Sequence, residues 1–359
     1  MEIAFIIIPI ESGENKDNKL SEIIQLTQSA GAKIQGYEFV KINNVNPSTY
    51  IGSGKAEQLN EKIQGLECNL VIFDGELSPS KTLNLSSALS DVKVVDRTTL
   101  ILDIFALNAK SSEGKLQVKL AQLKYIYPRL KGKGSSLSRL GGGIGTRGPG
   151  ETQLETDRRN IRRRIISLEK KLKEIETRRQ LQTENREKND VLSVALTGYT
   201  NTGKSTLLNA LTSSDVLTEN KLFATLDTTT RKLNLGNYNV IISDTVGFIK
   251  NIPTTLIEAF KSTLEAAINA DIILIVCDAN ADWQNEIATT NSMLDELNCK
   301  GARLTVINKC DAVNNFELYP KNAIFISAKN GTGLDKLKQA LKDEFARSGQ
   351  RIKTIYPEI

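Results

Sequence analysis

The chain has 359 residues, of which 40% are hydrophobic and 25% are charged, and its formal net charge is +5. This size and composition predict a globular protein of two or three domains with a sizeable core. The chain contains no histidine, which excludes histidine-based catalytic triads and the common histidine metal sites.

The first predicted element is a strand at 3–8, so the apolar N-terminus is interpreted as part of a fold and not as a signal peptide. Residues 1–110 continue with alternating strand and helix patterns, which predict a small α/β domain. The expected strands lie at 3–8, 70–73 and 92–95, and the expected helices at 19–30, 55–64 and 78–90. The short Gly-containing segment 50–55 is interpreted either as a tight turn into a helix or as a phosphate site.

No apolar run in the sequence reaches about 18 residues, the length that crosses a membrane as a helix. The four cysteines show no paired spacing, which is typical of reduced thiols in a cytoplasmic protein. We therefore expect a cytoplasmic location without integral membrane association, and peripheral membrane contact is left open.

Residues 111–188 change character, because leucines and isoleucines recur at spacings of three and four among many charged residues. This pattern predicts a long antiparallel helical hairpin after the α/β domain. Pro128 is expected to bend or end the first helix of the pair.

A basic segment with eight glycines, 131–150, joins the two expected helices. From 129 to 164 the chain has ten basic residues and three acidic ones, the pattern expected for a polyphosphate partner such as RNA. The predicted RNA contacts are Arg139, Gly142, Gly143, Arg147, Arg158, Arg159, Arg162 and Arg163. The alternative for the Gly-rich segment is a disordered linker, and the alternative for the arginines of the helix that follows is an ordinary solvated helix face.

A phosphate-binding loop of the form GxxxxGK[ST] lies between a buried strand expected at 191–197 and a helix expected at 204–211. In such a loop, backbone N–H groups and the helix dipole converge on phosphate oxygens. Lys204 is expected to reach the β- and γ-phosphates, and the Ser205 hydroxyl to ligate Mg²⁺. The loop consists of Gly198, Tyr199, Thr200, Asn201, Thr202, Gly203, Lys204 and Ser205.

A second apolar strand ends in a DxxG pattern formed by Asp244, Thr245, Val246 and Gly247. Asp244 is expected to hold Mg²⁺ through a water molecule, and the Gly247 N–H to contact the γ-phosphate. Such a pattern by itself is usually an ordinary turn, so its meaning here comes from its position after the phosphate loop.

A third apolar strand indicates which nucleotide base is bound. Its end carries Asn308, Lys309, Cys310 and Asp311. The Asp311 carboxylate can accept two N–H bonds from guanine, which adenine cannot supply, so a guanine nucleotide is favoured. In the following segment, Ser327, Ala328 and Lys329, the Ala328 N–H is expected to meet the guanine oxygen. These spacings predict a Ras-like P-loop GTPase domain at 189–346 and a short C-terminal tail at 347–359.

Specific motifs occur along nearly the whole chain. They are YIGSGK at 50–55, DR at 96–97, the segments 101–106 and 117–129, GGGIGTRGPGETQLETDRR at 141–159, LFATLD at 222–227 and DTVGF at 244–248. In these motifs the chain resembles the HflX family of translation-associated, ribosome-binding GTPases. The Gly-rich motif at 141–159 is the most specific of them.

The resemblance implies that Thr225 is the second Mg²⁺ ligand, and that Lys204, Thr225 and Gly247 are the catalytic residues. It implies that the binding site for GTP and GDP is also lined by a switch segment, which consists of Phe223, Ala224, Thr225, Leu226 and Asp227. It further implies a monomer that binds the 50S ribosomal subunit and its 23S rRNA through the N-terminal domain and the Gly-rich segment, and that splits stalled ribosomes under stress. Large-subunit assembly and ATP-dependent rRNA remodelling by the N-terminal domain are the alternatives.

Two positions depart from familiar patterns. Phe248 follows the DxxG pattern, where Ras-like enzymes place a glutamine that orients the attacking water. Intrinsic GTP hydrolysis is therefore expected to be slow and to be stimulated by the ribosome. Thr228 stands where the family usually has proline, which leaves the switch segment freer before nucleotide binds.

Overall fold

The computed structural model describes residues 2–11, 13–132, 153–188, 191–212, 223, 228–248, 256, 261–313 and 319–347. It divides into two compact units, Met1–Leu172 and Lys173–Ile359, and each unit has its own sheet. The expected mixed α/β class is confirmed. The domain limits at 110, 188 and 346 stay predictions.

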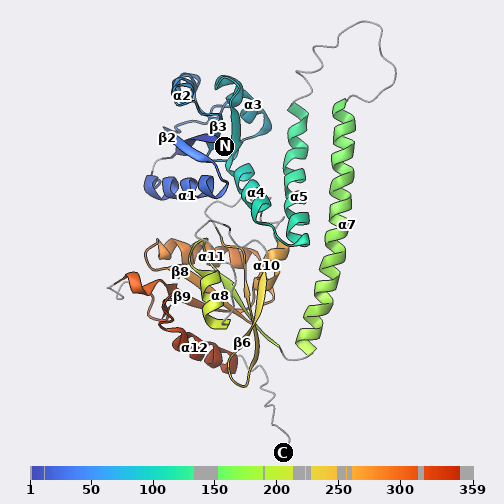
Figure 1. The fold of residues 1–359 in the computed structure, drawn as a ribbon, viewed down its shortest axis with the longest axis vertical. Coiled ribbons are helices and arrows are strands. Elements are labelled where there is room, and N and C mark those ends of the chain that lie inside the picture. The colour runs from blue at the N-terminus through green and yellow to red at the C-terminus, as the bar shows by residue number, and fades with distance from the viewer. Residues whose placement is uncertain are drawn as a thin grey trace, which may run out of the picture. The chain divides into compact units, whose positions relative to one another are not determined.

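The first unit contains a fully parallel sheet in the order β2-β1-β3-β4 (Figure 1). Its strands are β1 (Ile3–Ile10), β2 (Lys33–Lys41), β3 (Leu70–Phe73) and β4 (Lys93–Asp96). The central strands β1 and β3 are continuous apolar runs, as expected for strands that are buried on both faces.

Four helices flank this sheet: α1 (Lys16–Ser29), α2 (Ser53–Gly65), α3 (Pro79–Ala88) and α4 (Arg97–Asn108). Helices α2 and α3 pack on the face that presents Phe5, Val71 and Phe73. Helices α1 and α4 contact each other and cover the opposite face. The predicted strands and helices of this region are therefore confirmed, and β2 and α4 are added to them.

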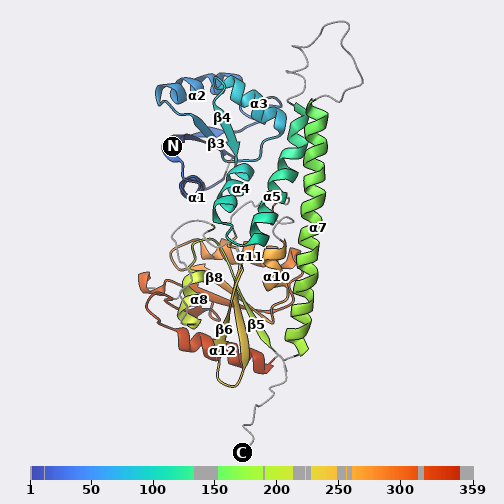
Figure 2. The same ribbon diagram turned by 45° about the vertical axis from the view of Figure 1, so that its right-hand side comes forward.

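The helical part of the chain begins with α5 (Ser112–Ile126) and a 3-10 turn, η1 (Tyr127–Gly132), and continues with α7 (Gln153–Lys188). Helix α5 ends two residues before Pro128, as predicted. Lys124 pairs with Glu169 at 2.8 Å, and the Arg158 guanidinium lies 5.4 Å from the Tyr127 ring centroid. These contacts run in opposite directions along the two helices, so the pair is antiparallel, as Figure 2 also shows.

The second unit contains a six-stranded sheet in the order β10-β9-β8-β5-β7-β6, parallel except for β6. Its strands are β5 (Leu192–Thr197), β6 (Thr229–Asn234), β7 (Asn239–Asp244), β8 (Ile272–Asp278), β9 (Ala302–Asn308) and β10 (Ile324–Phe325). The carboxyl ends of parallel strands share one edge of a sheet, so the motifs that follow β5, β7, β9 and β10 are brought together there.

Two layers of helices cover this second sheet. Helices α8 (Lys204–Thr212) and α12 (Leu334–Arg347) pack with one cluster of core residues, and α10 (Lys261–Ile268) and α11 (Trp283–Glu296) pack with the other. Within the described part of the chain, every helix is too short or too polar to cross a bilayer.

Candidate nucleotide-binding site

The phosphate loop lies between the end of β5 and the start of α8, as the sequence predicts. Gly198 has a φ of 131°, and a Cβ there would lie 2.1 Å from the Val276 carbonyl oxygen. Gly203 has a φ of 91°, and a Cβ there would lie 2.4 Å from Asn308 Nδ2. Only glycine fits at either position, because both the backbone conformation and the free space exclude a side chain.

Lys204 is folded back beneath this loop. The residue is 7% exposed, and its Nζ donates to the carbonyl oxygens of Gly198 at 3.1 Å and Tyr199 at 2.5 Å. Burial lowers the pKa of Lys204 to about 8, against the opposing effect of Asp244. The loop thus carries a desolvated cation at its centre, which suits a polyphosphate ligand.

The expected magnesium ligands meet across the sheet edge. Ser205 Oγ donates to Asp244 Oδ2 at 2.6 Å, and Asp244 is completely buried. Thr245 Oγ1 donates to the Leu196 carbonyl oxygen at 2.7 Å, which ties the DxxG segment to β5. A hydroxyl and a carboxylate in contact form a set of hard oxygen donors, so these residues fit Mg²⁺.

The DxxG segment continues directly against the phosphate loop. A Cβ at Gly247 would lie 2.8 Å from Thr200 Cγ2 and 2.9 Å from Lys204 Nζ, so this position also requires glycine. The Phe248 N–H donates to the Gly198 carbonyl at 3.0 Å, and the Thr200 N–H donates to the Phe248 carbonyl at 2.8 Å.

The Phe248 side chain is packed away from solvent. It is 3% exposed and forms a small cluster with Tyr199 and Leu264. The ring therefore acts as an apolar anchor for the end of the DxxG segment.

Asn308 connects the phosphate loop to the segment that is expected to meet the base. The residue is 2% exposed, its Nδ2 donates to the Thr202 carbonyl at 2.8 Å, and its Oδ1 accepts from the Ala328 N–H at 3.0 Å. The Ala328 N–H that was expected to meet the guanine oxygen is therefore engaged by Asn308, because Asn308 lies between the two loops. A guanine oxygen would share this N–H with Asn308.

Lys309 and Asp311 present complementary groups at the same strand end. Lys309 has a φ of 62°, and its Nζ donates to the Asn201 carbonyl at 2.9 Å and to Asp278 at 2.6 Å. The Asp311 carboxylate is exposed, and a hydrogen bond with Ser327 lowers its pKa. It is therefore ionised and accessible to an N–H donor at neutral pH.

The other expected site residues fall into two groups, those that the structure describes and those outside the described residues. Phe223 is buried with a φ of 58°, Ser327 is buried, Cys310 is half-buried and Lys329 is exposed. The remaining switch residues Ala224, Thr225, Leu226 and Asp227 lie outside the described residues, as do Arg139, Gly142, Gly143 and Arg147.

Sequence reasoning missed Asp278, which holds Lys309, and the bond from Thr245 to β5. Asp278 ends β8, so its place on the same edge of the sheet was the available signal.

Known families match the chain in three consecutive parts. A model described as the GTP-binding GTPase N-terminal region matches 17–106, and the corresponding middle region matches 108–186. A model described as a 50S ribosome-binding GTPase matches 193–309. The GTPase HflX of Caldanaerobacter subterraneus subsp. tengcongensis is 48% identical over 355 residues, 98% of this chain and 83% of the relative. The chain belongs to the HflX family of GTPases.

Other HflX relatives agree with this membership. The GTPase HflX of Escherichia coli is 39% identical, covering 95% of this chain and 82% of the relative. A crystal structure of a protein named SsGBP, in complex with GDP, has 27% identity and a TM-score of 0.52, covering 97% of this chain and 99% of that one. The HflX family, together with the site described above, gives this chain a GTP-binding and GTP-hydrolysing domain.

Proposed function

We propose that this HflX-family chain hydrolyses GTP while bound to the 50S ribosomal subunit, and that it splits stalled ribosomes under stress. The observation that supports this most is the buried Lys204 beneath a phosphate loop that Asn308 joins to the guanine-reading segment. The family model that matches 193–309 is described as a 50S ribosome-binding GTPase, which supports the choice of partner.

The residues of the site have distinct roles in this proposal. Lys204 contacts the β- and γ-phosphates, and Gly247 supplies an N–H to the γ-phosphate. Mg²⁺, when bound, neutralises the charge that builds up on the phosphate oxygens. Ser205 and Thr225 would ligate the ion, and Asp244 would hold it through water. Asp311 selects guanine by accepting its two N–H groups.

Hydrolysis by the free chain is proposed to be slow. Phe248 follows the DxxG segment and its ring is buried with Tyr199 and Leu264, so it cannot orient an attacking water. The missing polar group must come from elsewhere, and we propose that the ribosome supplies or positions it. Equal turnover with and without 50S subunits would contradict this.

RNA contact is proposed for the basic start of α7 and the Gly-rich segment before it. Arg159, Arg162 and Arg163 are exposed on α7, and Arg158 is half-buried beside Tyr127. Such a row of guanidinium groups matches a phosphate backbone. Arg139, Gly142, Gly143 and Arg147 are proposed to extend this surface.

The alternative phosphate site at 50–55 receives no support from the structure of that segment. Helix α2 begins at Ser53 after Gly52, and Lys55 Nζ is paired with the Glu38 carboxylate. This is the arrangement of a tight turn into a helix, and Lys55 is already neutralised. We therefore do not propose a phosphate site at 50–55.

The decisive experiment is sedimentation of the full chain with 50S subunits in GTP analogue, GDP and no nucleotide, across a salt series. We expect nucleotide-dependent binding that falls steeply with salt. Charge reversal at Arg162 and Arg163 should abolish it, whereas the same reversal at the exposed Lys170 and Lys171, further along α7, should not.

Binding that ignores nucleotide and salt would refute the proposal. A splitting assay on 70S ribosomes then separates the proposed role from large-subunit assembly, in which precursor subunits accumulate without splitting.

A further inference from the structure

Asp96 occupies the carboxyl end of β4 and caps the following helix, α4. It is 3% exposed, and its two carboxylate oxygens serve different elements. Oδ1 accepts from the Thr99 N–H at 3.0 Å and from Thr99 Oγ1 at 2.6 Å. Those two bonds are sufficient for a helix cap, so the second oxygen is available for another purpose.

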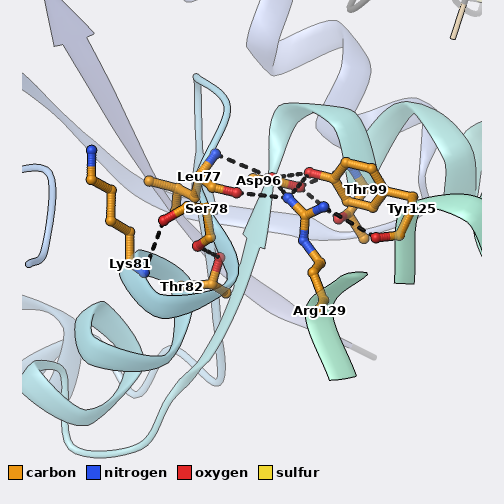
Figure 3. Close-up of polar contacts among 8 residues, drawn as sticks. All are labelled: Leu77, Ser78, Lys81, Thr82, Asp96, Thr99, Tyr125 and Arg129. Carbon is orange, nitrogen blue, oxygen red and sulfur yellow. Dashed lines mark hydrogen bonds and ion pairs between the residues drawn. The ribbon is translucent and has the colours of Figure 1, made fainter. Parts of the chain in front are cut away.

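The second oxygen, Oδ2, joins three other parts of the first unit (Figure 3). It accepts from the Leu77 N–H at 3.3 Å, from the Tyr125 hydroxyl, and from Arg129 Nη2 at 3.2 Å. Leu77 lies just before α3, Tyr125 lies on α5 and Arg129 lies in η1. One buried oxygen therefore connects the sheet to the first helix of the hairpin and to the turn that follows it.

Arg129 is held from several sides. Its Nη2 donates to the Leu77 carbonyl at 2.6 Å and its Nη1 to the Tyr125 carbonyl at 3.2 Å. Its guanidinium carbon also lies 3.4 Å from the centroid of the Tyr125 ring. A planar guanidinium that bonds along its edge and stacks on a ring is fixed in both position and orientation.

Tyr125 keeps its proton in this cluster. Burial, with the neighbouring Asp96 carboxylate, raises the pKa of Tyr125 well above its ordinary value. The hydroxyl can therefore donate to Asp96 while it accepts from Arg129. The result is a connected, partly buried network in which each member satisfies its neighbours.

We propose that the Asp96–Tyr125–Arg129 cluster positions the root of the Gly-rich segment for its contact with RNA. Arg129 lies two residues before the basic segment 131–150. Holding the residues that precede a binding segment in one place lowers the entropy cost of binding, because fewer orientations must be given up. These are positioning residues, and the RNA part of their role rests on the function proposed above.

The first test is amide hydrogen exchange at 126–132 in the full chain, with two variants. Tyr125→Phe removes only the hydroxyl, and Arg129→Lys keeps the charge but loses the planar fork. Ile63→Val, in the core beneath α2, is the control, because it lowers stability without touching the cluster. We expect exchange at 126–132 to rise about tenfold in both variants and to stay unchanged in the control. Unchanged exchange in both variants would overturn the inference.

The second test asks whether the cluster acts through the Gly-rich segment. Arg147→Ala, Arg129→Lys and the double variant are compared for 50S binding in GTP analogue. We expect each single change to weaken binding and the double change to cost less than their sum, since both affect one contact. Strictly additive losses would show that the cluster does not act through the segment. If the unaltered chain does not bind 50S, the proposed function fails, and the exchange experiment still decides whether the root is anchored.

Discussion

The Ser205 hydroxyl donates a 2.6 Å hydrogen bond to Asp244, 39 residues further along the chain. One residue begins a helix and the other ends a strand, yet they share one point at the sheet edge. The phosphate loop and the DxxG segment are therefore parts of one polar site, and this site has the oxygen chemistry that Mg²⁺ requires.

Replacing Ser205 should uncouple nucleotide binding from magnesium. We expect Ser205→Ala to bind GTP roughly 10- to 100-fold more weakly when Mg²⁺ is present. This corresponds to the loss of about 1.5–3 kcal/mol, the contribution of a bond to a charged group. With a chelator present, the variant and the unaltered chain should bind alike. Ser205→Thr retains the hydroxyl and should keep the magnesium response. Titration with a fluorescent GTP analogue measures all three, and an Ala variant with full magnesium dependence would contradict the assignment.

Nucleotide affinity should fall as pH rises above about 8. Burial lowers the pKa of Lys204 to about 8, and phosphates beside the ammonium would raise it again. The complex then holds more protons than the free chain, so higher pH favours dissociation. Calorimetry at pH 8.5 in two buffers of different ionisation enthalpy should reveal proton uptake, which Lys204→Met should lack.

The lowered pKa of Lys204 also predicts how the stability of the nucleotide-free chain depends on pH. Because the folded value lies below the ordinary 10.5, the unfolded state binds more protons between these values. The contribution of Lys204 to the free energy of unfolding should therefore increase as pH rises from about 8 to 10.5. Chemical unfolding of the unaltered chain and of Lys204→Met across this range measures the difference, and parallel pH profiles would refute it.

Base selection should depend on Asp311. The Asp311→Asn change replaces one carboxylate oxygen with an N–H donor, so one guanine N–H loses its acceptor. We expect about a 100-fold or greater loss of GTP affinity. Xanthosine triphosphate, which has a carbonyl in place of the guanine amino group, should recover binding. Asp311→Glu serves as the charge-matched control, and competition binding gives the result; a variant that still prefers GTP would exclude this role.

A glutamine at position 248 should not create a fast GTPase. Phe248 packs with Tyr199 and Leu264 and is 3% exposed, so Phe248→Gln buries an amide in an apolar cluster. We expect a loss of about 2–3 kcal/mol in the free energy of unfolding and little gain in single-turnover hydrolysis. Phe248→Leu keeps the cluster apolar and should be milder. A large rise in hydrolysis by the glutamine variant would show that the side chain can turn toward the phosphates.

The parts of the site that were predictable from sequence are local motifs at strand ends. The segments 198–205, 244–247 and 308–311 each follow an apolar strand, and parallel topology brings such ends together. Strand β2 was missed because Gly36 interrupts its pattern; that glycine packs beneath the Phe5 ring, where a Cβ would be 3.0 Å away. Helix α4 was missed because its apolar run lacks a clear helical period.

Contacts between distant segments could not be predicted in the same way. The burial of Phe248 depends on Leu264, and the bond from Ala328 to Asn308 depends on how two loops meet. The cluster around Asp96 joins residues 29 and 33 positions apart. Neither periodicity nor motif spacing carries information on such pairs, because they are set by the packing of whole elements.

The bridge from Thr202 through Asn308 to Ala328 consists only of protein groups. The separation between the phosphate loop and the segment expected to meet the base is therefore fixed by the chain itself. We expect such a site to select its ligand by length, and to accept a purine joined to its phosphates by a sugar of fixed reach. A guanine carried on a longer linker would engage the base segment or the phosphate loop, but not both, and would lose the gain that comes from binding at two linked points.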